Sequence, residues 1–152
     1  MLKVSFVRRR GQRDHVYVTR EDGSQLDWVF PTYGDHLPHD LCHLVVEDEL
    51  GMTEGFWGLI DAGVDVGLVD NEATLLRDGH PLVEHPDADF HGLVEAEAAV
   101  ATLGSPMAEV TQPDGVGPET VARLQERLAE LAARWRDLPD ATAIELTFAR
   151  RP

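Results

Sequence analysis

Two histidines spaced four residues apart, His39 and His43, are the side chains whose types and spacing could bind a metal ion. Residues i and i+4 lie on the same face of an α-helix, so both imidazoles could reach one ion. Asp40 directly follows the first histidine, which gives the pattern H-D-x-x-H. The pattern leaves the cofactor open: the pair is compatible with a divalent transition metal such as zinc, with Asp40 as a weak candidate for a catalytic base.

The elements around this pattern predict a helix over residues 38–50. A proline suits its first turn and a glycine suits a left-handed stop directly after it. At about 100° per residue, His39 and His43 share a face with Val46 and Leu50, and other apolar residues line the opposite face. We therefore expect a helix buried on both sides, with both imidazoles at least partly covered. Covered imidazoles need a metal, a carboxylate or a carbonyl as partner.

A third metal ligand must come from another element. Glu47 continues the i+4 spacing, but it lies about 12 Å along the helix axis from His39, too far for one ion to join both. A second segment rich in histidine and aspartate runs from His80 to His91, and a helix is predicted over residues 90–103. The predicted metal site consists of His39, His43 and His91.

Two resemblances bear on this stretch. H-D-x-x-H resembles the H-E-x-x-H signature of the zincin metallopeptidases, in which two histidines bind zinc and the glutamate is the general base. The resemblance implies the base role for Asp40, whose side chain is one methylene shorter than glutamate. The wider pattern P-H-D-L-x-H-x-x-V-E, followed by G-F-W-G, resembles a family of uncharacterised small bacterial proteins, and no activity comes with that resemblance.

Each candidate residue also has a structural explanation. His39 and Asp40 could simply occupy the polar first turn of the helix, and His43 could be an interior residue held by hydrogen bonds. His80 and His85 precede prolines in a predicted loop, where solvent would surround them. The single cysteine, Cys42, has no basic neighbour that would activate its thiol as a nucleophile.

Composition narrows the class of protein. The chain has 152 residues, enough for one domain with a hydrophobic core, and we treat residues 1–152 as that domain. The net charge of −15 argues against nucleic acid or an anionic membrane as a partner. No apolar run approaches the roughly 20 residues of a membrane span, and one cysteine excludes an internal disulfide. A cytoplasmic location is the resulting expectation.

The hydrophobic pattern predicts an α+β fold. Alternating apolar residues indicate three N-terminal strands over residues 2–8, 16–19 and 25–30, joined as an antiparallel meander, with a fourth strand at residues 143–149 beside them. Besides the two helices named above, we expect helices over residues 53–62 and 118–137. Residues 64–89 are predicted to contain a helical turn carrying Leu75 and Leu76.

Two functions are compatible with these features, and the sequence leaves open whether the protein is an enzyme. The favoured one is a binding protein without catalytic activity. It would recognise another protein or a small molecule through the helical hairpin at residues 38–62 and the acidic body. The alternative is a divalent-metal-binding protein, extending to a metal-dependent hydrolase, built on His39 and His43. The aromatic pair Phe56 and Trp57, flanked by glycines, could form a ligand platform or part of the core.

Overall fold

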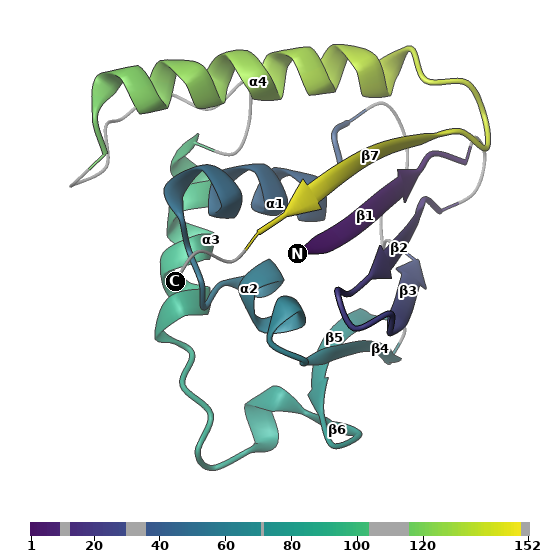
Figure 1. Cartoon of the computed structure of the whole chain (residues 1–152), viewed down its shortest axis with the longest axis vertical. Helices are drawn as coiled ribbons and strands as arrows, with labels where there is room; N and C mark the ends of the chain where they lie inside the picture. Colours follow the sequence, from purple (N-terminus) through teal and green to yellow (C-terminus); the bar gives the residue numbers. More distant parts are fainter. Residues whose placement is uncertain (10–12, 30–35, 71, 104–115, 150–152) are drawn as a thin grey trace.

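A computed structural model describes residues 1–9, 13–29, 36–70, 72–103 and 116–149. Its main feature is a four-stranded antiparallel sheet in the order β3-β2-β1-β7 (Figure 1). The strands are β1 (Leu2–Val7), β2 (His15–Thr19), β3 (Gln25–Val29) and β7 (Ala143–Phe148). Three N-terminal strands and one C-terminal strand thus share one sheet. The α+β prediction is confirmed.

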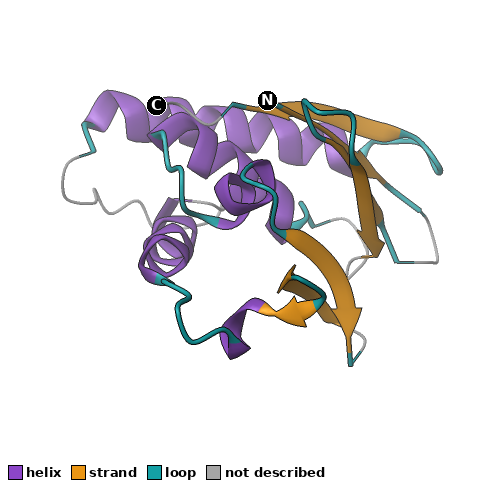
Figure 2. Cartoon of the chain, turned by 60° about the horizontal axis from the view of Figure 1, so that its bottom comes forward, coloured by secondary structure: helices purple, strands orange, loops and turns teal. Residues whose placement is uncertain are grey.

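Alternation of side chains gives this sheet one buried and one outward face. Leu2, Val4 and Phe6 of β1 are buried, whereas Lys3 lies on the outward face. Val4 lies opposite Val18 of β2 on one side and Leu146 of β7 on the other, so apolar residues of neighbouring strands meet on the same face. The helices gather against the buried face (Figure 2).

Four helices carry most of the remaining core, and each was predicted within a few residues. They are α1 (His39–Leu50), α2 (Phe56–Asp61), α3 (His91–Leu103) and α4 (Pro118–Arg136). The apolar stripe of α4 is buried, as its helical spacing predicted; it comprises Val121, Leu124, Leu128, Leu131 and Trp135. Among the described residues, no helix has the length and apolar character needed to cross a membrane.

Helix α1 lies in the middle of the molecule. It packs against α2, α3 and α4, and every residue from Leu41 to Glu47 is buried. The expectation of a helix covered on both sides is therefore confirmed. In α2, Trp57 and Ile60 are fully buried. Both helices of the predicted hairpin therefore contribute to the core.

Residues 64–89 differ from the sequence prediction. They form a small antiparallel sheet, which lies below α2 and far from α4 in Figure 1. Its elements are β4 (Asp65–Val69), β5 (Glu72–Arg77), β6 (His80–Pro81) and a 3-10 turn, η1 (Leu82–Glu84). The predicted helical turn at Leu75 and Leu76 is wrong, because both residues belong to β5.

Turn chemistry explains this correction. Asp78 and Gly79 both have positive φ, 54° and 78°, which is the conformation of a two-residue hairpin turn. Asp70, between β4 and β5, also has a positive φ of 51°. An Asp-Gly pair is a strong hairpin signal, and here it outweighs the tendency of the neighbouring leucines to form a helix.

Candidate metal centre

The innermost residue of the candidate centre is Glu47, a buried carboxylate on α1. Glu47 is fully buried, and its oxygens accept hydrogen bonds from the backbone N–H groups of Phe56, at 3.1 Å, and Trp57, at 2.9 Å. These amides open α2, so Glu47 supplies the acceptor that the first turn of this helix lacks. The same carboxylate lies 2.9 Å from Nδ1 of His43, one helical turn earlier.

A glycine makes room for this carboxylate. A Cβ atom at Gly55 would lie 2.4 Å from Oε1 of Glu47 and 3.0 Å from the Cβ of Ala96. Both distances are shorter than ordinary van der Waals contact. Any larger residue at position 55 would push Glu47 away from the amides and from His43. The first glycine of G-F-W-G is thus explained by close packing.

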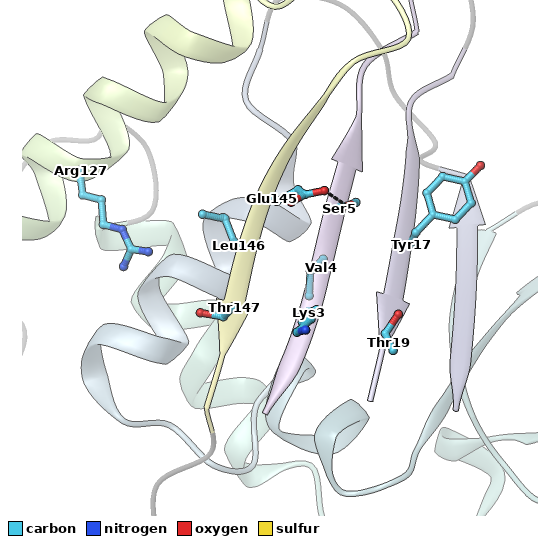
Figure 3. Close-up of a pocket in the computed structure, with 9 residues that line it drawn as sticks. All are labelled: Lys3, Val4, Ser5, Tyr17, Thr19, Arg127, Glu145, Leu146 and Thr147. Atoms are coloured by element: carbon cyan, nitrogen blue, oxygen red, sulfur yellow. Dashed lines mark hydrogen bonds between the residues drawn. The ribbon is translucent and has the colours of Figure 1, made fainter. Parts of the chain in front are cut away.

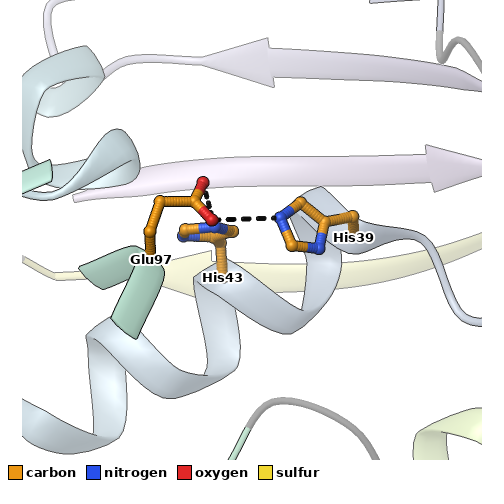
Figure 4. A group of neighbouring side chains, drawn as sticks. All are labelled: His39, His43 and Glu97. Carbon is orange, nitrogen blue, oxygen red and sulfur yellow. Dashed lines mark hydrogen bonds and ion pairs between the residues drawn. The ribbon is translucent and has the colours of Figure 1, made fainter. Parts of the chain in front are cut away.

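The other ring nitrogen of His43 faces outward to α3. Its Nε2 lies 2.9 Å from Oε1 of Glu97, and Nε2 of His39 lies 3.6 Å from Oε2 of the same residue. Figure 4 shows the three side chains converging, with both histidines projecting from α1 and Glu97 from α3. One possible ligand atom from each of these residues lies within 4.8 Å of the others. Among the described residues, this is the group that could hold a metal ion.

Three carboxylates favour the charged form of His43. Burial disfavours its charged form, but the hydrogen bond and the charge of Glu47 outweigh this cost, and the charges of Glu97 and Asp40 add to them. The pKa of His43 is therefore raised above its ordinary value of 6.5. When His43 is protonated, each ring nitrogen can donate to a carboxylate, Nδ1 to Glu47 and Nε2 to Glu97.

The spacing of the three side chains fits a small ion. Metal–ligand distances of about 2.0–2.2 Å in a tetrahedral zinc site place neighbouring ligand atoms about 3.3 Å apart. The observed separations of 2.9 Å, from Glu97 to His43, and 3.6 Å, from Glu97 to His39, bracket this value. Three protein ligands would leave the fourth position open, as in catalytic zinc sites. Glu47 would hold the Nδ1 proton of His43 and aim Nε2 at the ion.

A pocket of about 410 Å³ adjoins the candidate centre. The polar members of its lining are Asp40, His43, Thr74 and Glu97. Its apolar lining comprises Phe56, Ala73, Leu75, Leu82, Val83, Phe90 and Leu93. The two adjacent aromatic residues therefore have different roles. Trp57 belongs to the core, and Phe56 lines the pocket.

Asp40 is held in a fixed position at this pocket. Its Oδ2 accepts a hydrogen bond from Nε1 of Trp28 at 3.1 Å, and its backbone oxygen accepts one from Nε1 of Trp57 at 2.8 Å. Burial raises the pKa of Asp40, although the Trp28 hydrogen bond and the charges of His43 and His39 oppose the shift.

The structure brings together two of the three predicted ligands. His39 and His43 meet as expected, although the side chain of His39 is 64% exposed and not partly covered as predicted. It is the first residue of α1, where neighbouring elements cover the helix least. His91 begins α3, is exposed, and pairs with Glu95, whose Oε1 lies 2.9 Å from its Nε2. It does not belong to the cluster.

The third member of the cluster is Glu97 of α3, the helix on which the sequence placed the predicted ligand His91, and Glu97 itself was not predicted. The signal was present. Leu93, Glu97 and Val100 are spaced four and three residues apart, so a carboxylate interrupts the apolar stripe that faces α1. The exclusion of Cys42 as a nucleophile agrees with its surroundings, because burial raises the pKa of its thiol to about 12.

A second hollow, of about 660 Å³, lies on the outward face of the large sheet. Figure 3 shows that its side chains come from β1, β2 and β7, with Arg127 of α4 beside them. Ser5 donates to Glu145 across two of these strands. The lining mixes both signs of charge with hydroxyl groups, and none of its members belongs to the metal-ligand group.

Comparison of the chain with protein-family models, with curated proteins and with solved structures gave no match.

Proposed function

We propose that this protein binds a divalent transition metal ion, with zinc the best fit, through Nε2 of His39, Nε2 of His43 and the carboxylate of Glu97. Two imidazoles and one carboxylate are a ligand set that zinc uses when it keeps one position open. Metal binding alone is compatible with the binding protein favoured by the sequence, and it requires no catalysis.

One observation carries the proposal: the carboxylate of Glu47 is hydrogen-bonded to Nδ1 of His43, the ring nitrogen that faces the core. A ligating histidine almost always donates its other N–H to a carboxylate or carbonyl, which fixes the ring and its tautomer. Glu47 is itself fixed by the two amides of α2. The outward Nε2 of His43 is therefore aimed at Glu97 and His39 by groups that belong to the core.

The test is the metal content and zinc affinity of tag-free protein. We expect about one zinc per chain after purification with added zinc. His39→Ala and Glu97→Gln should each weaken zinc binding at least about 100-fold, because each removes one of three ligands. Glu95→Gln is the matched control, since it removes a carboxylate from the same exposed region of α3 and should leave affinity unchanged. Equal zinc affinity in all four proteins would refute the site.

A second candidate function is metal-dependent hydrolysis. The observation that favours it is the presence of Asp40 in the lining of the same pocket as His43 and Glu97, with its pKa raised by burial. A carboxylate whose pKa is raised above its ordinary value is a stronger base, which suits it to activating water beside a metal ion.

Ester hydrolysis by zinc-loaded protein tests this second candidate. We expect Asp40→Asn to lower kcat at least about 100-fold while zinc affinity is retained, because the variant removes only the base. Turnover no faster than that of zinc in buffer, or full activity in Asp40→Asn, would reject hydrolysis and leave metal binding unaffected.

A further inference from the structure

The pocket beside the candidate metal centre has an apolar wall built from several separate elements. Phe56 comes from α2, Leu75 from β5 and Leu93 from α3, and each is only half-buried. Leu82 and Val83 of η1 extend the same wall. Apolar side chains from four elements thus border one space, and its ionisable groups are Asp40, His43 and Glu97, of which the last two belong to the candidate metal centre.

We propose that this pocket binds a small organic acid with an apolar body, whose acid group meets the ion at His39, His43 and Glu97. This inference rests on the proposed metal site and names the class of ligand that the site would take. Pockets for small ligands have volumes of about 300–1,000 Å³, are mostly apolar and carry few polar groups. At about 410 Å³, the pocket is at the small end of that range.

Charge selects an acid as the group that meets the ion. A divalent ion held by two neutral imidazoles and one carboxylate keeps a net positive charge, which an anionic group would complement. Without the ion, the carboxyl groups in the lining are Asp40 and Glu97, and both would oppose an anion. Acid binding should therefore require the metal, while the apolar wall should set the preference among acids.

Straight-chain hydroxamic acids of two to ten carbons are suitable probes, because the hydroxamate group binds metals and the chain can be varied. Titration of zinc-loaded protein by calorimetry should show affinity rising about three- to fourfold for each added methylene until the pocket is full. Metal-free protein should bind none of the series. Equal affinity for all chain lengths, or tight binding without zinc, would overturn the inference.

Two exposed valines provide a matched pair of variants. Val83 is 73% exposed and lines the pocket, whereas Val94 is 65% exposed and lies outside the lining. Val83→Asp should weaken the binding of the long-chain probes and reduce the dependence on chain length, because it places a charge in the apolar lining. Val94→Asp should behave like the unaltered protein. Equal effects of the two substitutions would contradict the assigned pocket.

A separate zinc titration of each variant distinguishes the two possible failures. If zinc binds and Glu97→Gln weakens it, but hydroxamates show no dependence on chain length, the pocket assignment fails and the metal site stands. If zinc does not bind to the unaltered protein, the metal site itself fails. Val83→Asp and Val94→Asp should both keep the zinc affinity of the unaltered protein, since neither residue is a ligand.

Discussion

The two ring nitrogens of His43 face two different regions of the molecule. The inner region consists of Glu47, Gly55 and the first amides of α2, and Glu47 within it is fully buried. The outer region consists of His39 and Glu97, whose side chains are 64% and 63% exposed, and Glu97 also lines the pocket. One imidazole therefore joins a region held inside the core to a region open to solvent.

We expect the inner region to determine the stability of the fold, and the outer region to affect mainly metal binding. In the inner region each polar group has its partner inside the protein, so removal of one leaves others buried and unpaired. In the outer region water can replace a lost partner, so the same kind of substitution should cost little stability. Metal affinity should depend on both regions, because the inner one orients His43 and the outer one supplies the other two ligands.

The strongest effect is expected for Glu47→Ala. It leaves the N–H groups of Phe56 and Trp57 and the Nδ1 proton of His43 without their acceptor, inside the core. We expect the free energy of unfolding to fall by about 3–5 kcal/mol. Chemical denaturation followed by tryptophan fluorescence measures it. A loss below about 1 kcal/mol would mean that the inner region does not support the fold.

Gly55→Ala should have the next largest effect. The added Cβ would contact a carboxylate that three hydrogen bonds hold in place, and it would also crowd Ala96. We expect a loss of about 1–3 kcal/mol in the free energy of unfolding. Gly117→Ala is the control, because Gly117 has open space around it and a negative φ of −70°. A similar loss in both variants would contradict the close packing around Glu47.

The pH dependence of metal-free protein should report on His43. Its folded-state pKa is raised above 6.5, so its proton stabilises the fold fully below pH 6.5, and this contribution is lost as the pH rises through the folded pKa. Denaturation midpoints between pH 5.5 and 9 should therefore fall less steeply in His43→Gln than in the unaltered protein. Zinc affinity should change in the opposite direction and increase with pH, because the ion displaces the Nε2 proton.

The smallest effect on stability is expected in the outer region. Without metal, His39→Ala and Glu97→Gln should each change the free energy of unfolding by about 1 kcal/mol or less, since both side chains are largely exposed. At a zinc concentration that saturates only the unaltered protein, that protein should gain more thermal stability than either variant, because it binds the ion most tightly. Differential scanning fluorimetry with and without zinc measures both results. A large loss without metal would erase the distinction between the two regions.

Much of the fold could be predicted because, in most elements, the spacing of apolar residues agrees with the residues that begin and end a helix or strand. The alternation of Leu2, Val4 and Phe6 and the stripe along α4 define their buried faces without tertiary information. The prediction for residues 64–89 is wrong because the adjacent leucines Leu75 and Leu76 are compatible with both a helical turn and a strand, whereas the Asp78-Gly79 pair favours a hairpin.

The candidate site was less accessible to sequence reasoning. The i, i+4 spacing identified His39 and His43 because they share one helix. Glu97 lies 54 residues beyond His43, and no local rule states which turn of α3 packs against α1. The role of Glu47 was equally hidden, since its acceptor function depends on where α2 begins. The positions of Glu97 and Glu47 relative to His43 depend on how the helices pack together, which the residue pattern of a single helix does not reveal.

The most direct test of the central claim is anomalous X-ray diffraction from crystals grown with zinc. We predict one strong peak about 2.0–2.2 Å from Nε2 of His39, Nε2 of His43 and a carboxylate oxygen of Glu97, with Glu47 still bonded to Nδ1 of His43. No peak at this position, with His43 Nε2 still paired to Glu97, would contradict the account.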